Sequence, residues 1–250
     1  MTAGADWTLW LTSALALVLG GVVKGSLGVG LPLISVPVLS LWLPAGRAIG
    51  LLAVPVVLSN LVQAREGALV RPAWQRFRWL IAAQFVATIA TVRFTADLPS
   101  QQLGILVAVA VLVAVGLMWA QPRMVIEPQH ERGVGIAVGL MAGVLGGASS
   151  LTGPVFISYL MALGLRRDEF VRSISLIYLC GSLPIYGAML FFGRIAWSDV
   201  GLSVLALVPV YLGMQLGQRL RQRLADALFR RVVLVFLVIV AGLLLLKAAG

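Results

Sequence analysis

The stretch GVVKGSLGVGLP at residues 21–32 has a related copy, GVLGGASSLTGP, at residues 143–154. Four positions are identical at a constant offset of 122 residues: Gly21/Gly143, Val22/Val144, Gly25/Gly147 and Pro32/Pro154. In each stretch, glycines and small polar residues interrupt a long apolar run, which resumes at the proline. Two related halves, each with a broken helix near the middle of the bilayer, are typical of secondary transporters. We therefore expect the function to lie where the two breaks are.

The composition indicates a membrane protein. Hydrophobic residues make up 60% of the 250 residues and charged residues only 11%, and the mean hydropathy is +1.02. Apolar segments recur with lengths close to the roughly 17–25 residues that cross a bilayer as a helix. We expect an integral, all-α polytopic membrane protein.

Ten apolar runs are visible, five on each side of one extended polar stretch. They lie at about 7–23, 31–43, 48–64, 77–94, 103–120, 134–148, 154–164, 171–192, 200–217 and 232–249. We predict one membrane domain made of two inverted-topology repeats, residues 1–122 and 133–250, joined by a cytoplasmic linker at 123–132. Each repeat should hold a broken, re-entrant helical hairpin followed by three transmembrane helices, about eight to ten membrane segments in all.

The positive charges indicate the orientation of the chain. The net charge of +10 would suggest a nucleic-acid partner in a soluble protein. Here the basic residues lie in short loops between apolar runs, so topology explains them better and we expect no nucleic acid. Fourteen of the 19 Lys and Arg residues fall at 65–78, 123–132, 166–172 and 219–231, which we place in the cytoplasm.

Two topologies are open for the broken segments. If each enters the membrane and returns on the same side, every basic cluster is cytoplasmic, both termini are outside and the halves have opposite orientations. If each crosses only once, one basic cluster must lie outside. We prefer the hairpin version, with both termini periplasmic.

Cysteine and histidine usage excludes several chemistries. Cys180 is the only cysteine, so no internal disulfide can form, and the only histidine, His130, lies in the polar linker. A His/Cys metal site therefore cannot assemble. We expect no metal and no cofactor.

The backbone of each break suits an anion. Glycine weakens a helix and allows left-handed conformations, and proline is well tolerated at the first helical position. We therefore expect helices to restart near Pro32 and Pro154, with Thr152 or Gly153 near the second cap. A helix N-terminus presents free N–H donors and about half a positive charge. Two such ends meeting near the midplane would form an anion site.

Side chains near the breaks add donors. Lys24 is the only charged residue inside an apolar run far from a loop, and because burial there costs roughly 2.5–3.5 kcal/mol it should face the interior or a cavity. All nine acidic residues fall in predicted loops or helix ends, which leaves no carboxylate in the membrane to bind a cation. The predicted substrate-binding residues are Lys24, Ser26, Gly28, Gly30, Ser149, Ser150, Thr152 and Gly153. The predicted hinge residues at the helix breaks are Gly21, Gly25, Pro32, Gly143, Gly147 and Pro154.

Each assignment has a simpler alternative. Glycines four residues apart, such as Gly21 and Gly25, commonly serve only close helix packing. Lys24 could instead extend to a membrane surface, and hydroxyls in membrane helices usually bond back to their own backbone. The functional interpretation is favoured because break, proline and polar residues occur twice in register. Weaker candidates for lining the path are Asn60, Gln63, Tyr178 and Tyr186.

These two glycine-rich motifs, each leading to a proline and an apolar helix, resemble the sulfite exporter TauE/SafE family. Two further segments are similar to it: RAIG at 47–50 and GRIAW at 193–197. The resemblance covers nearly the whole chain and implies a permease of the bacterial inner membrane for small sulfur-containing or organic anions, usually exported. The chain departs from the family's denser glycine runs at Lys24 and at Ser149-Ser150, which leaves the substrate open.

We therefore predict a transporter, by preference an exporter, that binds a small anion such as sulfite, a sulfonate or a carboxylate between the broken helices and exposes it alternately to either side. The alternative is an anion channel with the same site, which would lack saturation and counterflow. An enzyme would need a nucleophile with a base, and none is evident. The expected partners are the anion and the lipid bilayer; a homodimer is compatible with the sequence but not determined by it.

Overall fold

The computed structural model describes residues 3–27, 30–65, 70–120, 125–221 and 226–249, and in these ranges the regular structure is helical throughout. The helices are α1 Ala3–Leu27, α2 Leu31–Leu39, α3 Ala45–Gly50, α4 Ala53–Arg65, α5 Val70–Thr95, α6 Ser100–Ala120, α7 Glu131–Ser149, α8 Gly153–Ala162, α9 Arg167–Phe191, α10 Trp197–Leu205, α11 Leu207–Arg221 and α12 Asp226–Ala249.

Many of these helices can cross a bilayer. Among the described residues six spans are long and apolar enough: Trp7–Ser26, Ala45–Val62, Pro72–Thr95, Ser100–Trp119, Glu131–Ser149 and Arg172–Phe191. A seventh is formed if α10 and α11, which meet at an angle of 46°, count as one bent span. The all-helical, multi-pass fold expected from the sequence is confirmed. The expected total of about eight to ten segments also counts short apolar helices such as α8.

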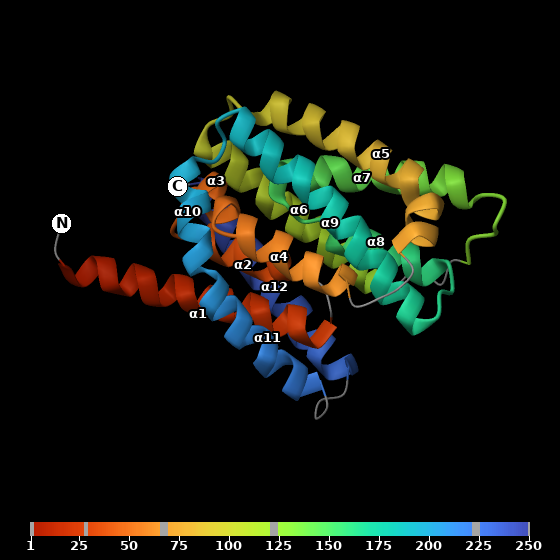
Figure 1. Cartoon of the computed structure of the whole chain (residues 1–250). Coiled ribbons are helices and arrows are strands. Elements are labelled where there is room, and N and C mark those ends of the chain that lie inside the picture. Colours follow the sequence, from red (N-terminus) through yellow and green to blue (C-terminus); the bar gives the residue numbers. More distant parts are fainter. Residues whose placement is uncertain (1–2, 28–29, 66–69, 121–124, 222–225, 250) are drawn as a thin grey trace.

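Glycines set how closely the long helices approach. α1 lies along α11 on one side of the bundle, and α5 lies along α7 on the opposite side (Figure 1). A Cβ atom at Gly25 would overlap the carbonyl oxygen of Met214, and one at Gly139 would overlap that of Leu80. Such close backbone contact gives membrane helices van der Waals energy where lipid supplies no hydrophobic driving force. Between these pairs, α4 packs against α9 and α6 against α12.

The first broken segment folds back on itself. Ser35 of α2 donates to the carbonyl of Ala16 at 3.1 Å, and beyond the end of α2 the indole of Trp42 donates to Ser13 at 3.3 Å. Residues further beyond the break bond to residues earlier in α1, so α2 runs antiparallel to α1. The segment is therefore a hairpin with a long first arm and a short second arm.

The second broken segment has the same form. The hydroxyl of Tyr159, late in α8, donates to the carbonyl of Glu131 at the start of α7. Near the break, Thr152 lies against Gly146, late in α7. The ten residues of α8 rise about 15 Å at 1.5 Å per residue, which is about half of the hydrocarbon thickness. This return arm ends well before it has recrossed a bilayer.

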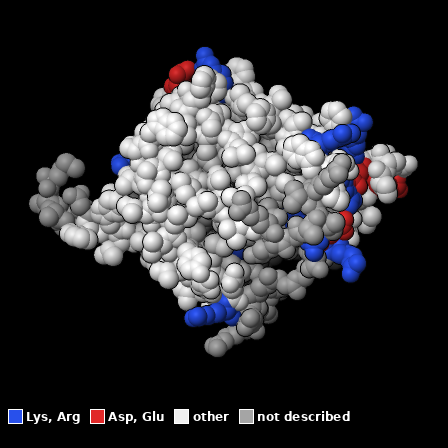
Figure 2. Space-filling model, in the orientation of Figure 1, with Lys and Arg blue, Asp and Glu red and all other residues white. Residues whose placement is uncertain are grey.

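The two ends of the bundle differ in charge. The start of α1 and the end of α12 lie towards one side of the molecule (Figure 1), where Lys247 donates to the carbonyl of Ser40 at 3.0 Å. The starts of α5, α7 and α9 meet at the other side, and we call this the basic end; its exposed cations are Arg76, Arg78, Arg132 and Arg166. Figure 2 shows charged side chains gathered at the right-hand end of the view, while most of the remaining face is uncharged.

Candidate functional site

The first break is built on a glycine in the left-handed conformation. α1 ends at Leu27 and α2 begins at Leu31, with Pro32 as its second residue. Gly30 precedes α2 with φ 103° and ψ 13°, and it is buried. Glycine adopts this conformation readily, whereas a residue with a Cβ atom is strained in it. The predicted restart at Pro32 is confirmed, whereas the predicted binding residue Gly28 lies outside the described residues.

The second break uses a serine in the same backbone region. α7 ends at Ser149, and Ser150 follows with φ 63° and ψ 11°; it is the one non-glycine residue with positive φ in the described part of the chain. Thr152 is the residue just before α8 and makes no side-chain capping bond, and Pro154 is the second residue of α8. A left-handed serine costs of order 1–3 kcal/mol, and such strain is concentrated at functional sites. The predicted restart at Pro154, with Thr152 at the cap, is confirmed.

Lys24 is buried in the protein near the first break. Only 3% of its surface is exposed, and its Nζ donates to Oδ1 of Asn60 in α4 at 2.7 Å. An ammonium group has three donors, so this bond occupies one of them. The same bond fixes the orientation of the Asn60 amide, whose Nδ2 is buried without a hydrogen-bond partner. The Lys24 ammonium and the Asn60 amide N–H groups therefore lie together, and Asn60 Oδ1 is the acceptor between them.

Two predicted hydroxyls are already engaged with the backbone. Ser26 Oγ donates to the carbonyls of Val22 at 2.8 Å and Gly217 at 3.0 Å. Ser149 Oγ donates to the carbonyl of Leu145 at 2.7 Å. A hydroxyl has one hydrogen, so neither group has a free donor in this conformation. For these two serines the contacts are those of the simpler alternative.

Helix α9 supplies two tyrosines to the second break. The Ser150 hydroxyl lies 3.4 Å from the hydroxyl of Tyr186. The hydroxyl of Tyr178 faces the start of α8, where a Cβ atom at Gly153 would lie 2.6 Å from it. That tyrosine hydroxyl is buried beside the side chain of Thr152. Asn60, Tyr178 and Tyr186, the weaker candidates in the sequence, thus all contact predicted site residues, while the side chain of Gln63 is outside the described part.

Arg194 was not among the predicted site residues. It lies in the turn between α9 and α10, it is 8% exposed, and it donates to the carbonyls of Gly147 at 2.6 Å and Ala148 at 3.2 Å and to Thr95 Oγ1 at 2.9 Å. Burial lowers the pKa of its guanidinium to about 10, so the group is charged at neutral pH. Its Nε has no partner. The sequence feature that could have identified it is its position as an isolated arginine in a loop far from the four basic clusters.

The segments 47–50 and 193–197, which lie almost 150 residues apart, meet in the structure. A Cβ atom at Gly46 would overlap the carbonyl oxygen of Arg194. Arg47 Nε pairs with Asp199 Oδ1 at 3.2 Å, and Asp199 Oδ2 accepts from the backbone N–H of Ala196. The turn that carries Arg194 is therefore fixed against α3.

The four predicted hinge glycines lie within helices. Gly21 and Gly25 are in α1 and face the backbone of α11, while Gly143 and Gly147 are in α7 and face α5. These contacts are those of helix packing, and a hinge role for the four residues stays a prediction.

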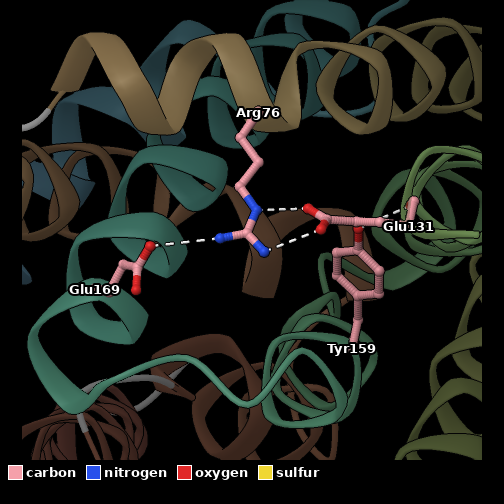
Figure 3. Close-up of polar contacts among 4 residues, drawn as sticks. All are labelled: Arg76, Glu131, Tyr159 and Glu169. Atoms are coloured by element: carbon pink, nitrogen blue, oxygen red, sulfur yellow. Dashed lines mark hydrogen bonds and ion pairs between the residues drawn. The ribbon is translucent and has the colours of Figure 1, made fainter. Parts of the chain in front are cut away.

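A charged network links three helices at the basic end. Arg76 of α5 makes two hydrogen bonds to the carboxylate of Glu131 in α7, at 2.5 and 2.9 Å, and a third to Glu169 of α9 at 3.4 Å (Figure 3). A pocket of about 80 Å³ lies beside it, lined also by Arg172 and Ser173. A bidentate arginine–carboxylate pair fixes geometry as well as adding energy, so this contact holds three helices together.

Each break is surrounded by its own partner helices. Residues of the first break bond to α4 and α11, and those of the second contact α5, α9 and the turn before α10. The two clusters are connected through α4 and α9, which pack against each other. In the described part of the chain no hydrogen bond joins one break directly to the other.

A bundle of apolar helices, broken at two buried points and holding a buried lysine, defines a multi-pass membrane protein. The chain belongs to the sulfite exporter TauE/SafE family, whose family model matches residues 13–244. The match covers both breaks and the segments 47–50 and 193–197. No curated protein and no solved structure matches the chain.

Proposed function

We propose that this protein transports a small anion with acceptor oxygens, such as sulfite, a sulfonate or a carboxylate, and binds it at the helix breaks. Lys24, the hydroxyls of Ser150 and Thr152, and the N-terminal N–H groups of α2 and α8 are the donors. The remaining predicted residues shape the two breaks. Helix N-termini stabilise negative charge through their free N–H groups and their dipole.

The observation that carries this proposal is a set of buried donors without acceptors. Asn60 Nδ2 and Arg194 Nε belong to side chains that are 2% and 8% exposed, and each lacks a partner. Each of these side chains contacts a residue next to a break. A buried donor left unpaired costs about 1–3 kcal/mol. An anion that accepts these hydrogen bonds would recover that cost, whereas a cation would not.

The membrane potential favours export of an anion. Lys24 and Arg194 form no ion pair with a described carboxylate. An inside-negative potential assists outward movement of a monovalent anion by about 2.3 kcal/mol per 100 mV. Export therefore needs no coupled proton or sodium ion, in agreement with the placement of the acidic residues outside the apolar runs.

The helix contacts support two inverted repeats. The hairpin α1–α2 corresponds to α7–α8, and the α1–α11 contact has a counterpart in the α7–α5 contact. The α4–α9 and α6–α12 contacts each join one proposed repeat to the other. We propose repeats at 1–122 and 133–250, a cytoplasmic linker at 123–132 and periplasmic termini in a bacterial inner membrane.

In this scheme the Arg76 network is the closed cytoplasmic gate. It links α5 of the first repeat to α7 and α9 of the second. Rocking of one repeat against the other, which gives alternating access, has to separate Arg76 from Glu131. The present conformation is then the one closed at the basic end.

Counterflow in proteoliposomes tests the proposal. Vesicles loaded with unlabelled sulfite should accumulate labelled sulfite transiently if a carrier is present, and a channel should give no such accumulation. Lys24→Ala and Thr152→Ala should reduce the initial rate strongly, whereas Arg93→Gln, which removes an exposed positive charge, should not. Unchanged sulfite, sulfonate and carboxylate transport by both site variants would refute the assignment.

A further inference from the structure

The second break contains two helix ends of opposite polarity. The C-terminus of α7 carries about half a negative charge, and the N-terminus of α8 about half a positive charge. The two ends are separated by Ser150 and Leu151 and the cap Thr152. An anion at this break would be attracted by α8 and repelled by α7, so the break alone would bind it weakly.

Arg194 is bonded to the negative end. The last carbonyls of a helix have no intrahelical partner, and Arg194 donates Nη1 to Gly147 O and Nη2 to Ala148 O. The preceding carbonyl, that of Gly146, accepts from the backbone N–H of Ser150 at 2.8 Å. A charged donor on the final carbonyls offsets the negative end of α7 and leaves the positive end of α8 uncompensated.

The first break has its cation in a different place. Lys24 lies in the last turn of α1 itself. At the offset of 122 residues that relates the two motifs, the position of Lys24 corresponds to Gly146, so the second copy has no cation of its own. Nη1 of Arg194, which donates to Gly147 O, also donates to Thr95 Oγ1 of α5 at 2.9 Å.

We infer that Arg194 is the positioning residue that gives the second break the positive charge that Lys24 gives the first. This inference rests on the proposed function. The anion site then includes a residue from the turn between α9 and α10, which explains why a buried arginine lies where a helix ends. Arg194 acts through the field at the break and through the carbonyls of α7.

Anion valence separates this role from a purely structural one. Binding of methanesulfonate, which carries one charge, and of sulfate, which carries two, is measured by calorimetry on the purified protein. Loss of a positive charge weakens a divalent anion more than a monovalent one, because the Coulomb energy scales with the product of the charges. A general loosening of the fold weakens both equally.

Three variants and one control make the test. Arg194→Gln keeps a donor for the α7 carbonyls and removes the charge; we expect a loss of about tenfold for methanesulfonate, the scale of a cation at a helix C-terminus, and a larger loss for sulfate. Arg194→Lys should keep the wild-type ratio of the two affinities. Thr95→Asp keeps Arg194 and pairs it with a carboxylate, so it should act like Arg194→Gln. Arg93→Gln, an equal charge change at an exposed site nearby, should have no effect.

The outcomes are distinct. If the wild type binds none of the panel of sulfite, sulfonates and carboxylates, the proposed function fails. If it binds them and both Arg194→Gln and Thr95→Asp leave the sulfate-to-methanesulfonate ratio unchanged, the inference about Arg194 is overturned while the proposed function stands. If Arg194→Gln does not fold, Thr95→Asp and Arg194→Lys still decide the question.

Discussion

The two helix breaks have similar backbone elements and different side chains. Both consist of a long helix, a residue in the left-handed region, and a short helix with a proline as its second residue. The first break has Gly30 in the left-handed position and a cation from its own helix. The second has Ser150 in the left-handed region at the end of α7, two residues before the position that matches Gly30 at the offset of 122, and it has Arg194 from a distant turn. The repeated sequence therefore places a break in each half, while the position of the left-handed residue and the source of the charge differ.

The largest expected difference between the halves is in helix packing. Gly25→Ala would push a Cβ atom into the carbonyl of Met214, whereas at Gly147 the nearest atoms are a side-chain atom of Thr91 at 2.8 Å and the Thr88 carbonyl at 3.0 Å. Overpacking costs typically 1–3 kcal/mol, and we expect about 3 kcal/mol at Gly25 and about 1 kcal/mol at Gly147. Thermal unfolding in detergent measures both. Gly116→Ala, in open space on α6, is the control and should be neutral or stabilising; equal losses at Gly25 and Gly147 would remove the asymmetry.

A charge change at the first break should weaken anion binding, as the changes proposed for the second break do. Asn60→Asp would place a carboxylate about where Oδ1 now lies, 2.7 Å from Lys24 Nζ. The buried ion pair cancels the positive charge, so we expect anion affinity to fall about thirtyfold, consistent with the several kcal/mol that juxtaposed like charges cost. Thermal stability should be kept, since the neutral partner of Lys24 is replaced by a charged one. Calorimetric titration checks the affinity, with Gln75→Glu as the exposed control; undiminished binding would separate Lys24 from the anion.

The left-handed residues should respond in opposite directions. Gly30→Ala introduces a strained Cβ atom, and we expect it to destabilise the protein by about 1–2 kcal/mol. Ser150→Gly relieves the same strain and should be neutral or slightly stabilising, at the expense of the contact with Tyr186. The melting temperatures of the two variants give the signs directly. A loss at both positions would mean that Ser150 is needed for more than its conformation.

The smallest effect is expected at Tyr186. Its hydroxyl lies 3.4 Å from that of Ser150, which is long for such a bond. Tyr186→Phe should therefore cost about 0.5 kcal/mol or less, at the lower limit for a hydrogen bond. Stability and anion affinity are measured together. A loss of tenfold in affinity with normal stability would instead place this hydroxyl in direct contact with the anion.

Much of the backbone was predictable and part of the site was not. Hydropathy, the doubled motif and the two prolines are local signals, and they located both breaks to within a few residues. The engaged hydroxyls of Ser26 and Ser149 could not be foreseen as such, because a serine in a helix can bond either to its own backbone or outward. Arg194 could not be predicted as a site residue, because nothing local shows that its turn packs onto the end of α7.

The amino-acid sequence alone determined that this is a multi-pass membrane protein with two broken helices, because apolar length and the φ preferences of glycine and proline act within one segment. The tertiary structure decided which donors are satisfied and which are left free. It paired Lys24 with Asn60, it brought Arg194 to α7, and it joined Arg76 to two other helices. Those contacts link residues tens of positions apart, so they depend on how whole helices pack and not on the residues beside them in the chain.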